Sequence, residues 1–230
     1  MFESHTKSRP YTGWSSFEYP VSVASLAALD DAPDGMYDGV AVGLGRNRAM
    51  QNGVAPTHDR DVLLAGRDLI NRALDENKPF LPVRFYFRGY SPALLRWTMH
   101  LFAPCKRRIY FVSANAYELD IAAFENLRLA RHAYTPETVY SHCSRFRNTP
   151  VDVRHAEYER LAASMRNGFD VKFPLRIMLR RDLGLRDMLR DGHHRLLAAK
   201  EVGLSMLPVR FVFAGHAPHA LLNPGAAWML

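Results

Sequence analysis

The chain has little cysteine, no long apolar run and no apolar leader, and each absence excludes a class of protein. Only two cysteines, Cys105 and Cys143, occur in 230 residues, and they have neither the number nor the C-x-x-C spacing of a disulfide framework or a zinc site. We therefore expect reduced thiols and disfavour redox chemistry. No apolar stretch approaches the roughly 20 residues of a membrane-spanning helix, and the opening MFESHTKSRPYTGW lacks a secretory apolar run. We expect a cytoplasmic protein with no membrane partner.

Two catalytic motifs are also missing. Gly43 and Gly45 match the start of a dinucleotide-binding fingerprint, but Arg48 stands where the third glycine should be. No G-x-S-x-G nucleophile elbow is present. Neither a dinucleotide oxidoreductase nor a serine hydrolase of that type is indicated.

What the chain does have is apolar material and positive charge. It is 48% hydrophobic, 11% aromatic and 23% charged, which is typical of a globular protein. Thirty Lys and Arg against twenty-three Asp and Glu give a net charge of +7, carried mostly by arginine. The planar arginine fork suits phosphates and carboxylates, so an anionic partner is indicated. Nucleic acid is one such partner, although net charge alone brings no specificity.

The pattern predicts three regions. Residues 1–56 are rich in Gly, Asp, Ser and Pro and are predicted to be irregular, with short strands. Residues 57–135 are predicted to form an α/β region, with a helix from Val62 to Leu74, a strand over LPVRFYF and a helix capped by Asp120. Residues 136–230 follow a polar stretch and are predicted to form the last domain. The overall class is α+β.

The last region has the clearest pattern. A helix is expected up to Met165, ended by Asn167-Gly168, and the apolar run LRIML predicts a strand. A short strand, the loop DGHHR, a helix closed by Gly203 and a final strand over LPVRFVF follow.

An internal echo links two parts of the chain. Residues 63–89 align with 189–215, sharing a glycine loop, a helix and the string LPVRF. A duplication would explain the echo, and so would chance, because a helix that enters a buried strand through a proline is a common construction. If the repeat is real, the first copy carries AGRDL where the second carries DGHHR, and only the second is expected to carry chemistry.

The DGHHR loop is the strongest candidate for a binding site. A loop between a strand and a helix presents backbone N–H groups with the helix dipole behind them, which favours anions. Gly192 allows a sharp turn, and His193, His194 and Arg195 supply donors for phosphate oxygens. Asp191 could cap the helix, orient a histidine or hold magnesium beside the phosphates. Solvated caps and a surface ion pair are the alternative, and adjacent histidines rarely chelate one metal, so no protein metal site is expected.

The string RDMLRDGHHRLLAAKEVGLSMLPVRFV resembles the ParB/sulfiredoxin superfamily, with a strand, a D-G-x-H-R loop, a helix and a Pro-Val strand. The resemblance spans residues 150–214 and implies a ParB/sulfiredoxin-like domain whose loop binds nucleotide phosphates, hence ATP, ADP or another nucleotide with magnesium, or otherwise no cofactor. Sulfiredoxins need a cysteine where this chain has His193. Partition ParB proteins carry a helix-turn-helix region, and only a short tail follows here, so partition-type DNA binding is not expected. The free-serine kinases of the superfamily remain the best enzymatic analogue.

Phosphoryl transfer needs a positioned base. Glu157 and Glu159 are the candidates, with Asp152 just before them and His193 as a further acid/base group. First-turn acids are also favoured by the helix dipole alone. Three basic residues are candidates for supplementary phosphate contacts, with simple surface solvation as the alternative for each: Arg154, Arg176 and Lys200.

Three functions remain open. The leading hypothesis is a small-metabolite enzyme that binds a nucleotide or another phosphorylated ligand at DGHHR, with phosphotransfer as the reaction that the resemblance to free-serine kinases implies. The first alternative is a nucleic-acid-binding or nuclease-like protein, favoured by the net charge and by the strings KRRIYF and SRFRN. The second is a nucleotide-independent acid/base enzyme acting on an amino-acid-like substrate, whose carboxylate Arg195 would bind.

Overall fold

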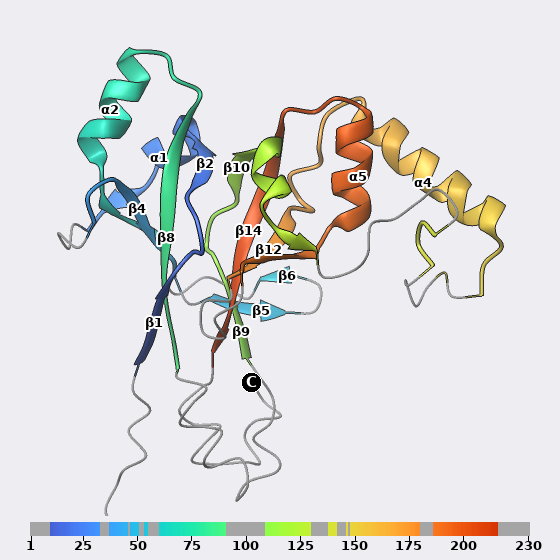
Figure 1. The fold of residues 1–230 in the computed structure, drawn as a ribbon, viewed down its shortest axis with the longest axis horizontal. Coiled ribbons are helices and arrows are strands. Elements are labelled where there is room, and N and C mark those ends of the chain that lie inside the picture. The colour runs from blue at the N-terminus through green and yellow to red at the C-terminus, as the bar shows by residue number, and fades with distance from the viewer. Residues whose placement is uncertain are drawn as a thin grey trace, which may run out of the picture.

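The computed structural model describes residues 10–32, 37–45, 47–50, 53–54, 60–90, 109–129, 138–141, 146, 148–179 and 186–215 (Figure 1). It has both helices and a mixed sheet, so the α+β class is confirmed. In these residues, none of the helices has the length and apolar character needed to cross a membrane.

The described elements fall into two halves, which we call the first half (residues 10–90) and the second half (residues 109–215). The first half contains β1 (Pro10–Trp14), β2 (Tyr19–Ser22), α1 (Val23–Ala27), β3 (Asp30–Asp31), β4 (Val40–Gly43), β5 (Asn47–Met50), β6 (Gly53–Val54), β7 (Val62–Ala65), α2 (Arg67–Asp75) and β8 (Phe80–Tyr90). The second half contains β9 (Ile109–Val112), β10 (Tyr117–Asp120), the 3₁₀ helix η2 (Ile121–Glu125), β11 (Arg128–Leu129), α4 (Val151–Met165), β12 (Leu175–Leu179), β13 (Met188–Asp191), α5 (His193–Glu201) and β14 (Met206–Gly215).

One long strand organises each half. In the first half, β8 pairs with β1 and β2 antiparallel and with β4 parallel. In the second half, β14 pairs with β9 and β10 antiparallel and with β12 parallel. Figure 1 shows α2 and α5 at the same end of these two strands. Strand pairs cross both predicted region boundaries, because β4 pairs with β8 and β11 pairs with β13.

The repetition extends to register. Tyr19 pairs with Val83 in the first half, and Tyr117 pairs with Val209 in the second. The β4–β7 and β12–β13 pairs are both antiparallel. In each pair the register shifts at the same place, between the second and third residues of β4 or of β12. The pairs also share their outer neighbour, because β3 lies parallel to β7 and β11 parallel to β13. The sequence echo therefore lies on a repeated structural unit.

Two strand pairs among the described residues join the halves: β5 with β9, and β2 with β10. Strands β2 and β10 lie antiparallel with Val21 opposite Leu119, and these two residues hold the same place in their own halves. A pair of equivalent residues facing each other in this way is the signature of a pseudo-two-fold axis. The axis passes between β2 and β10, and both residues are fully buried.

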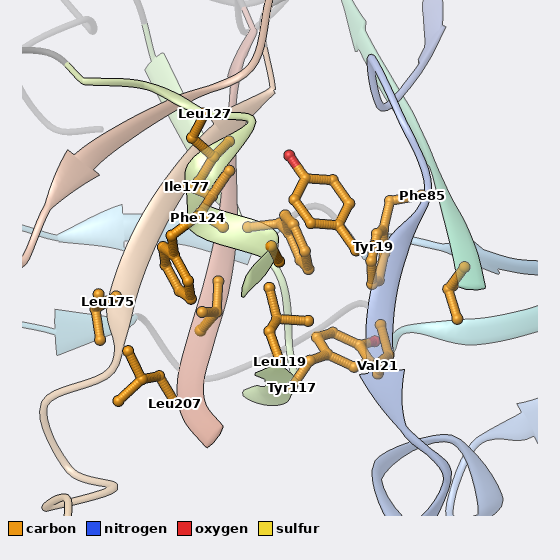
Figure 2. Packing of buried hydrophobic residues seen from close by; sticks show 14 of the residues in the cluster. Tyr19, Val21, Phe85, Tyr117, Leu119, Phe124, Leu127, Leu175, Ile177 and Leu207 are labelled. Atoms are coloured by element: carbon orange, nitrogen blue, oxygen red, sulfur yellow. The ribbon is translucent and has the colours of Figure 1, made fainter. Parts of the chain in front are cut away.

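Aromatic rings pack around this axis (Figure 2). The rings of Phe85 and Phe211, which are equivalent, have centroids 3.9 Å apart. Tyr19 meets Phe211 edge-on at 5.0 Å and 68°, and Tyr117 meets Phe85 at 5.1 Å and 67°. Edge-to-face contacts of this kind add to the stabilisation from apolar burial, so the core is concentrated where the halves meet.

Each half also provides a buried carboxylate for the tyrosine of the other half. Asp61 accepts hydrogen bonds from the backbone N–H groups of Gly45, Ala114 and Asn115, at 2.8, 3.0 and 2.8 Å, and from the Tyr117 hydroxyl at 2.9 Å. Burial raises the pKa of Asp61, and these four hydrogen bonds act in the opposite direction.

The second carboxylate mirrors the first. Asp187 accepts from the backbone N–H and the hydroxyl of Ser16, at 2.8 and 3.0 Å, and from the Tyr19 hydroxyl at 2.9 Å. Asp61 and Asp187 are both buried, and each forms its tyrosine hydrogen bond with the other half. Both hydrogen bonds therefore form only when the two halves are packed together.

The local structure confirms several sequence predictions and corrects two, the start of α2 and the type of helix that follows Asp120. The predicted strands over LPVRFYF, LRIML and LPVRFVF are β8, β12 and β14. The predicted helix from Val62 is wrong at its start: residues 62–65 form β7, and α2 begins only at Arg67. The apolar run that opens this segment is a buried strand, which helical periodicity alone does not distinguish from a helix.

The predicted ends of three elements are also observed. Asp120 caps the segment that follows, its carboxylate accepting from the N–H of Ala122, although that segment is a 3₁₀ helix. Gly168 and Gly203 follow α4 and α5 with φ of 106° and 76°, the left-handed conformation expected after a helix. The basic residues of the strings KRRIYF and SRFRN lie outside the described residues: Lys106, Arg107, Arg108, Arg145 and Arg147.

Candidate functional site

The DGHHR loop joins the end of β13 to the start of α5. Gly192 has φ 96° and ψ 19°, and its counterpart Gly66, before α2, has φ 93° and ψ 21°. A side chain at Gly192 would meet Leu175 at 2.8 Å, so glycine is needed both for its φ and for the space. The predicted strand, glycine turn and helix are thus observed at this position.

His194 is held by a segment that sequence patterns did not single out. The backbone N–H of Tyr140 donates to His194 Nε2 at 2.9 Å, and the two rings stack with centroids 4.1 Å apart. Because Nε2 accepts, the neutral ring carries its proton on Nδ1. Arg154, a buried residue of α4, donates to the Val139 carbonyl at 2.8 Å, so residues 138–141 bridge α4 and α5.

The backbone at Tyr140 is unusual. Its φ is 57°, in the left-handed region that bulky residues rarely adopt. Such conformations cost about 1–3 kcal/mol and persist only where surrounding contacts enforce them. Here the stack on His194 and a second ring contact with Phe146, at 4.9 Å, accompany the strained backbone. No composition or periodicity signal marks this residue in the sequence.

Arg195 turns back onto the chain before β12. Its Nη1 donates to the carbonyl oxygens of Phe173 and Pro174, the latter at 3.2 Å, and its Nη2 lies 3.3 Å from Asp191 Oδ2. Only 20% of the Arg195 side chain is exposed. Burial is the main cause that lowers the pKa of Arg195; Arg176 lowers it further, and Asp191 opposes both.

Two further guanidinium groups lie on the neighbouring strands β12 and β14. Arg176 of β12 stands next to Arg210 of β14 in the parallel register. Arg210 donates to the carbonyl oxygens of Ser113 and Ala114 at 2.7 and 2.6 Å. Burial lowers the pKa of Arg210, Asp61 raises it, and Arg176 lowers it further. The second half therefore brings together three guanidinium groups that repel one another in part.

The predicted bases lie on α4. Glu157 Oε1 accepts from Arg160 at 2.6 Å, and Glu159 lies 3.4 Å from His155, so both carboxylates are engaged within their own helix. Asp152 is exposed in the first turn of α4, and His193 is half-buried at the start of α5. A catalytic role for Glu157, Glu159 or His193 stays a prediction.

The three supplementary basic residues lie in different surroundings. Arg154 is buried and donates to the Val139 carbonyl, Arg176 lies opposite Asp191 in the β12–β13 register, and Lys200 is exposed in the last turn of α5. In the part of the chain that the structure describes, no three metal-ligating side chains come together. Comparisons of the chain with family models, with curated proteins and with solved structures find no match.

Proposed function

We propose that the second half binds an anionic ligand that bears a phosphate, most simply a nucleotide, at the start of α5. The observation that carries this proposal is the gathering of Arg195 and Arg176 beside the left-handed turn at Gly192: Arg176 lies opposite Asp191 in the β12–β13 register, and Arg195 Nη2 lies 3.3 Å from Asp191 Oδ2. An anion placed there would relieve the repulsion between the two guanidinium groups and would meet the positive end of the α5 dipole.

The remaining donors of the loop fit the same ligand. The backbone N–H of Tyr140 donates to His194 Nε2 and so fixes the imidazole ring at the start of α5, beside the proposed ligand. Asp191, whose side chain is 57% exposed, is the carboxylate that would hold a magnesium ion accompanying the phosphates. The resemblance to the ParB/sulfiredoxin loop supports a nucleotide, and a phosphotransferase acting on a small metabolite is the reaction class that we propose.

Titration calorimetry with magnesium-ATP, and with inorganic pyrophosphate as a second probe, tests the proposal. His194→Ala and Arg195→Ala are expected to weaken binding at least tenfold, which is about 1.4 kcal/mol. Arg176→Gln removes a guanidinium group that forms no hydrogen bond or ion pair with the described residues, so the variant should fold normally. It is expected to weaken binding severalfold.

Arg60→Gln is the matched control. Arg60 pairs with Asp30 on the surface of the first half, its side chain is 83% exposed, and the change removes the same unit of charge. Unchanged affinity in this variant and reduced affinity in the three others would support the proposal. Equal effects in the three arginine variants, Arg60→Gln, Arg176→Gln and Arg195→Ala, would mean that the ligand senses only net charge. Retention on DNA that falls steeply with salt would then favour the nucleic-acid alternative.

A further inference from the structure

A pocket of about 320 Å³ lies in the first half, between α2, β4 and β8. Its lining includes three carboxylates and two cations: Glu18, Asp38, Glu76, Arg72 and Lys78. The lining thus carries one net negative charge in a chain whose total is +7. This local reversal of sign is the first indication that the ligand is a cation.

The pseudo-two-fold axis places the pocket where the second half holds a guanidinium group. Leu69 stands three residues after Gly66 in the first turn of α2, as Arg195 stands three residues after Gly192 in α5. Leu69 lines the pocket and is 38% exposed. The first half therefore has an apolar side chain at the position from which the second half sends its arginine.

The acceptors for that arginine have counterparts as well. In the second half, Arg195 donates to the carbonyl oxygens of the two residues that precede β12, Phe173 and Pro174. The two residues that precede β4 are Asp38 and Gly39, and both line the pocket. Strands β4 and β12 have the same parallel register on β8 and β14, so the two pairs of carbonyl groups occupy equivalent places.

The charges of the pocket are unevenly satisfied. Glu76 lies 2.5 Å from the Lys78 ammonium, whose hydrogen bond is the main cause that lowers the pKa of Glu76. Glu18 accepts from the Tyr37 hydroxyl at 2.6 Å, which is a neutral donor and does not balance its charge. Glu18 and the exposed Asp38 are thus the two lining carboxylates available to a cation.

We propose that this pocket binds a small guanidinium compound, with the ligand's guanidinium group on the carbonyl oxygens of Asp38 and Gly39, as Arg195 lies on their counterparts. A planar fork with several N–H donors matches paired carbonyl and carboxylate acceptors, whereas a compact ammonium group does not. The pocket lies in the first half and shares no residue with the DGHHR loop, so this proposal can be tested independently of the anion-binding function.

Titration calorimetry of the full chain with agmatine tests the proposal, with putrescine as the probe that carries an ammonium group in place of the guanidinium group. Agmatine is expected to bind at least tenfold more tightly than putrescine at low ionic strength. Asp38→Asn is expected to weaken agmatine binding at least fivefold. Asp75→Asn is the matched control, because Asp75 is an exposed carboxylate of α2 that does not line the pocket.

Leu69→Arg is the decisive variant, because it supplies from within the chain the group that agmatine would bring. Agmatine binding is expected to be lost in Leu69→Arg and retained in Leu69→Ala. Asp38→Asn changes an exposed side chain and remains informative if Leu69→Arg folds poorly. Absence of agmatine binding to the unmodified chain, or binding that neither Leu69→Arg nor Asp38→Asn reduces, would overturn the proposal.

Discussion

The two halves share one scaffold and differ in the first turn of a helix. Gly66 and Gly192 have the same backbone conformation, and the strands that flank them have the same register. Three residues later the first half has Leu69 and the second half has Arg195. The second half also inserts α4 between β11 and β12, where the first half passes from β3 to β4 within a few residues. The scaffold therefore depends on glycines and on the shared core, and the chemistry depends on a few replaceable side chains.

The largest expected effect comes from the buried carboxylates that join the halves. Asp61→Ala and Asp187→Ala are each expected to lower the free energy of unfolding by about 3–5 kcal/mol, because each leaves several buried donors without an acceptor. Urea unfolding measures both. Tyr117→Phe removes one hydrogen bond and is expected to cost about 1 kcal/mol. A cost below that of Tyr117→Phe for either aspartate variant would contradict the role given to these residues.

The second prediction separates the two glycines. A Cβ on Gly66 would meet the Gly39 carbonyl oxygen and the Val40 Cα, both at 2.8 Å, whereas a Cβ on Gly192 would meet the side chain of Leu175. Backbone yields less than a side chain, so Gly66→Ala is expected to cost about 2–3 kcal/mol and Gly192→Ala about 1–2 kcal/mol. The midpoints of chemical unfolding measure the order. The reverse order would show that the second glycine is the more constrained.

The third prediction compares Arg195 with Leu69. Arg195→Ala is expected to lower the free energy of unfolding by about 1–2 kcal/mol, because it removes a largely buried guanidinium from two carbonyl oxygens and a carboxylate. Leu69→Ala, on a half-exposed surface, is expected to cost less than about 0.5 kcal/mol. Thermal unfolding of both variants provides the measurement. Equal losses of unfolding free energy in the two variants would contradict the stabilising role given to Arg195.

The smallest effect is a pH dependence that belongs to Asp61. Its pKa is raised in the folded chain, so its contribution to stability is fully present below its ordinary pKa and is lost as the pH rises through the raised value. The difference in unfolding free energy between the unmodified chain and Asp61→Asn should therefore shrink as the pH rises through that window. Urea unfolding at a series of acidic pH values measures it. A difference that grows with pH would mean that the four hydrogen bonds outweigh burial.

Sequence patterns could predict the elements with strong local signals. The string LPVRF occurs in both β8 and β14, and the helix ends at Gly168 and Gly203 follow from the conformational freedom of glycine. The start of α2 was assigned wrongly, because the apolar residues of β7 fit a helical spacing as well as a strand. Local patterns do not report which residues a segment will be packed against.

The candidate site also has one part that the local sequence predicts and another that it does not. The glycine turn and the helix that follows could be predicted, because they depend on neighbouring residues in the chain. The contact of His194 with Tyr140, and the return of Arg195 to Phe173, depend on how distant segments pack. The strings AGRDL and DGHHR already align Leu69 with Arg195, but the correspondence of Asp38 and Gly39 with Phe173 and Pro174 becomes visible only when the two halves are compared in space.

The reciprocal bonds of Asp61 to Tyr117 and of Asp187 to Tyr19 bear on how such a chain could have arisen. Two unlinked copies of one half, related by a true two-fold axis, would make one contact of this type twice. Linking the copies in tandem turns a concentration-dependent association into an intramolecular one. Once joined, the two copies no longer had to remain identical, and in this chain one helix start carries Arg195 where the other carries Leu69.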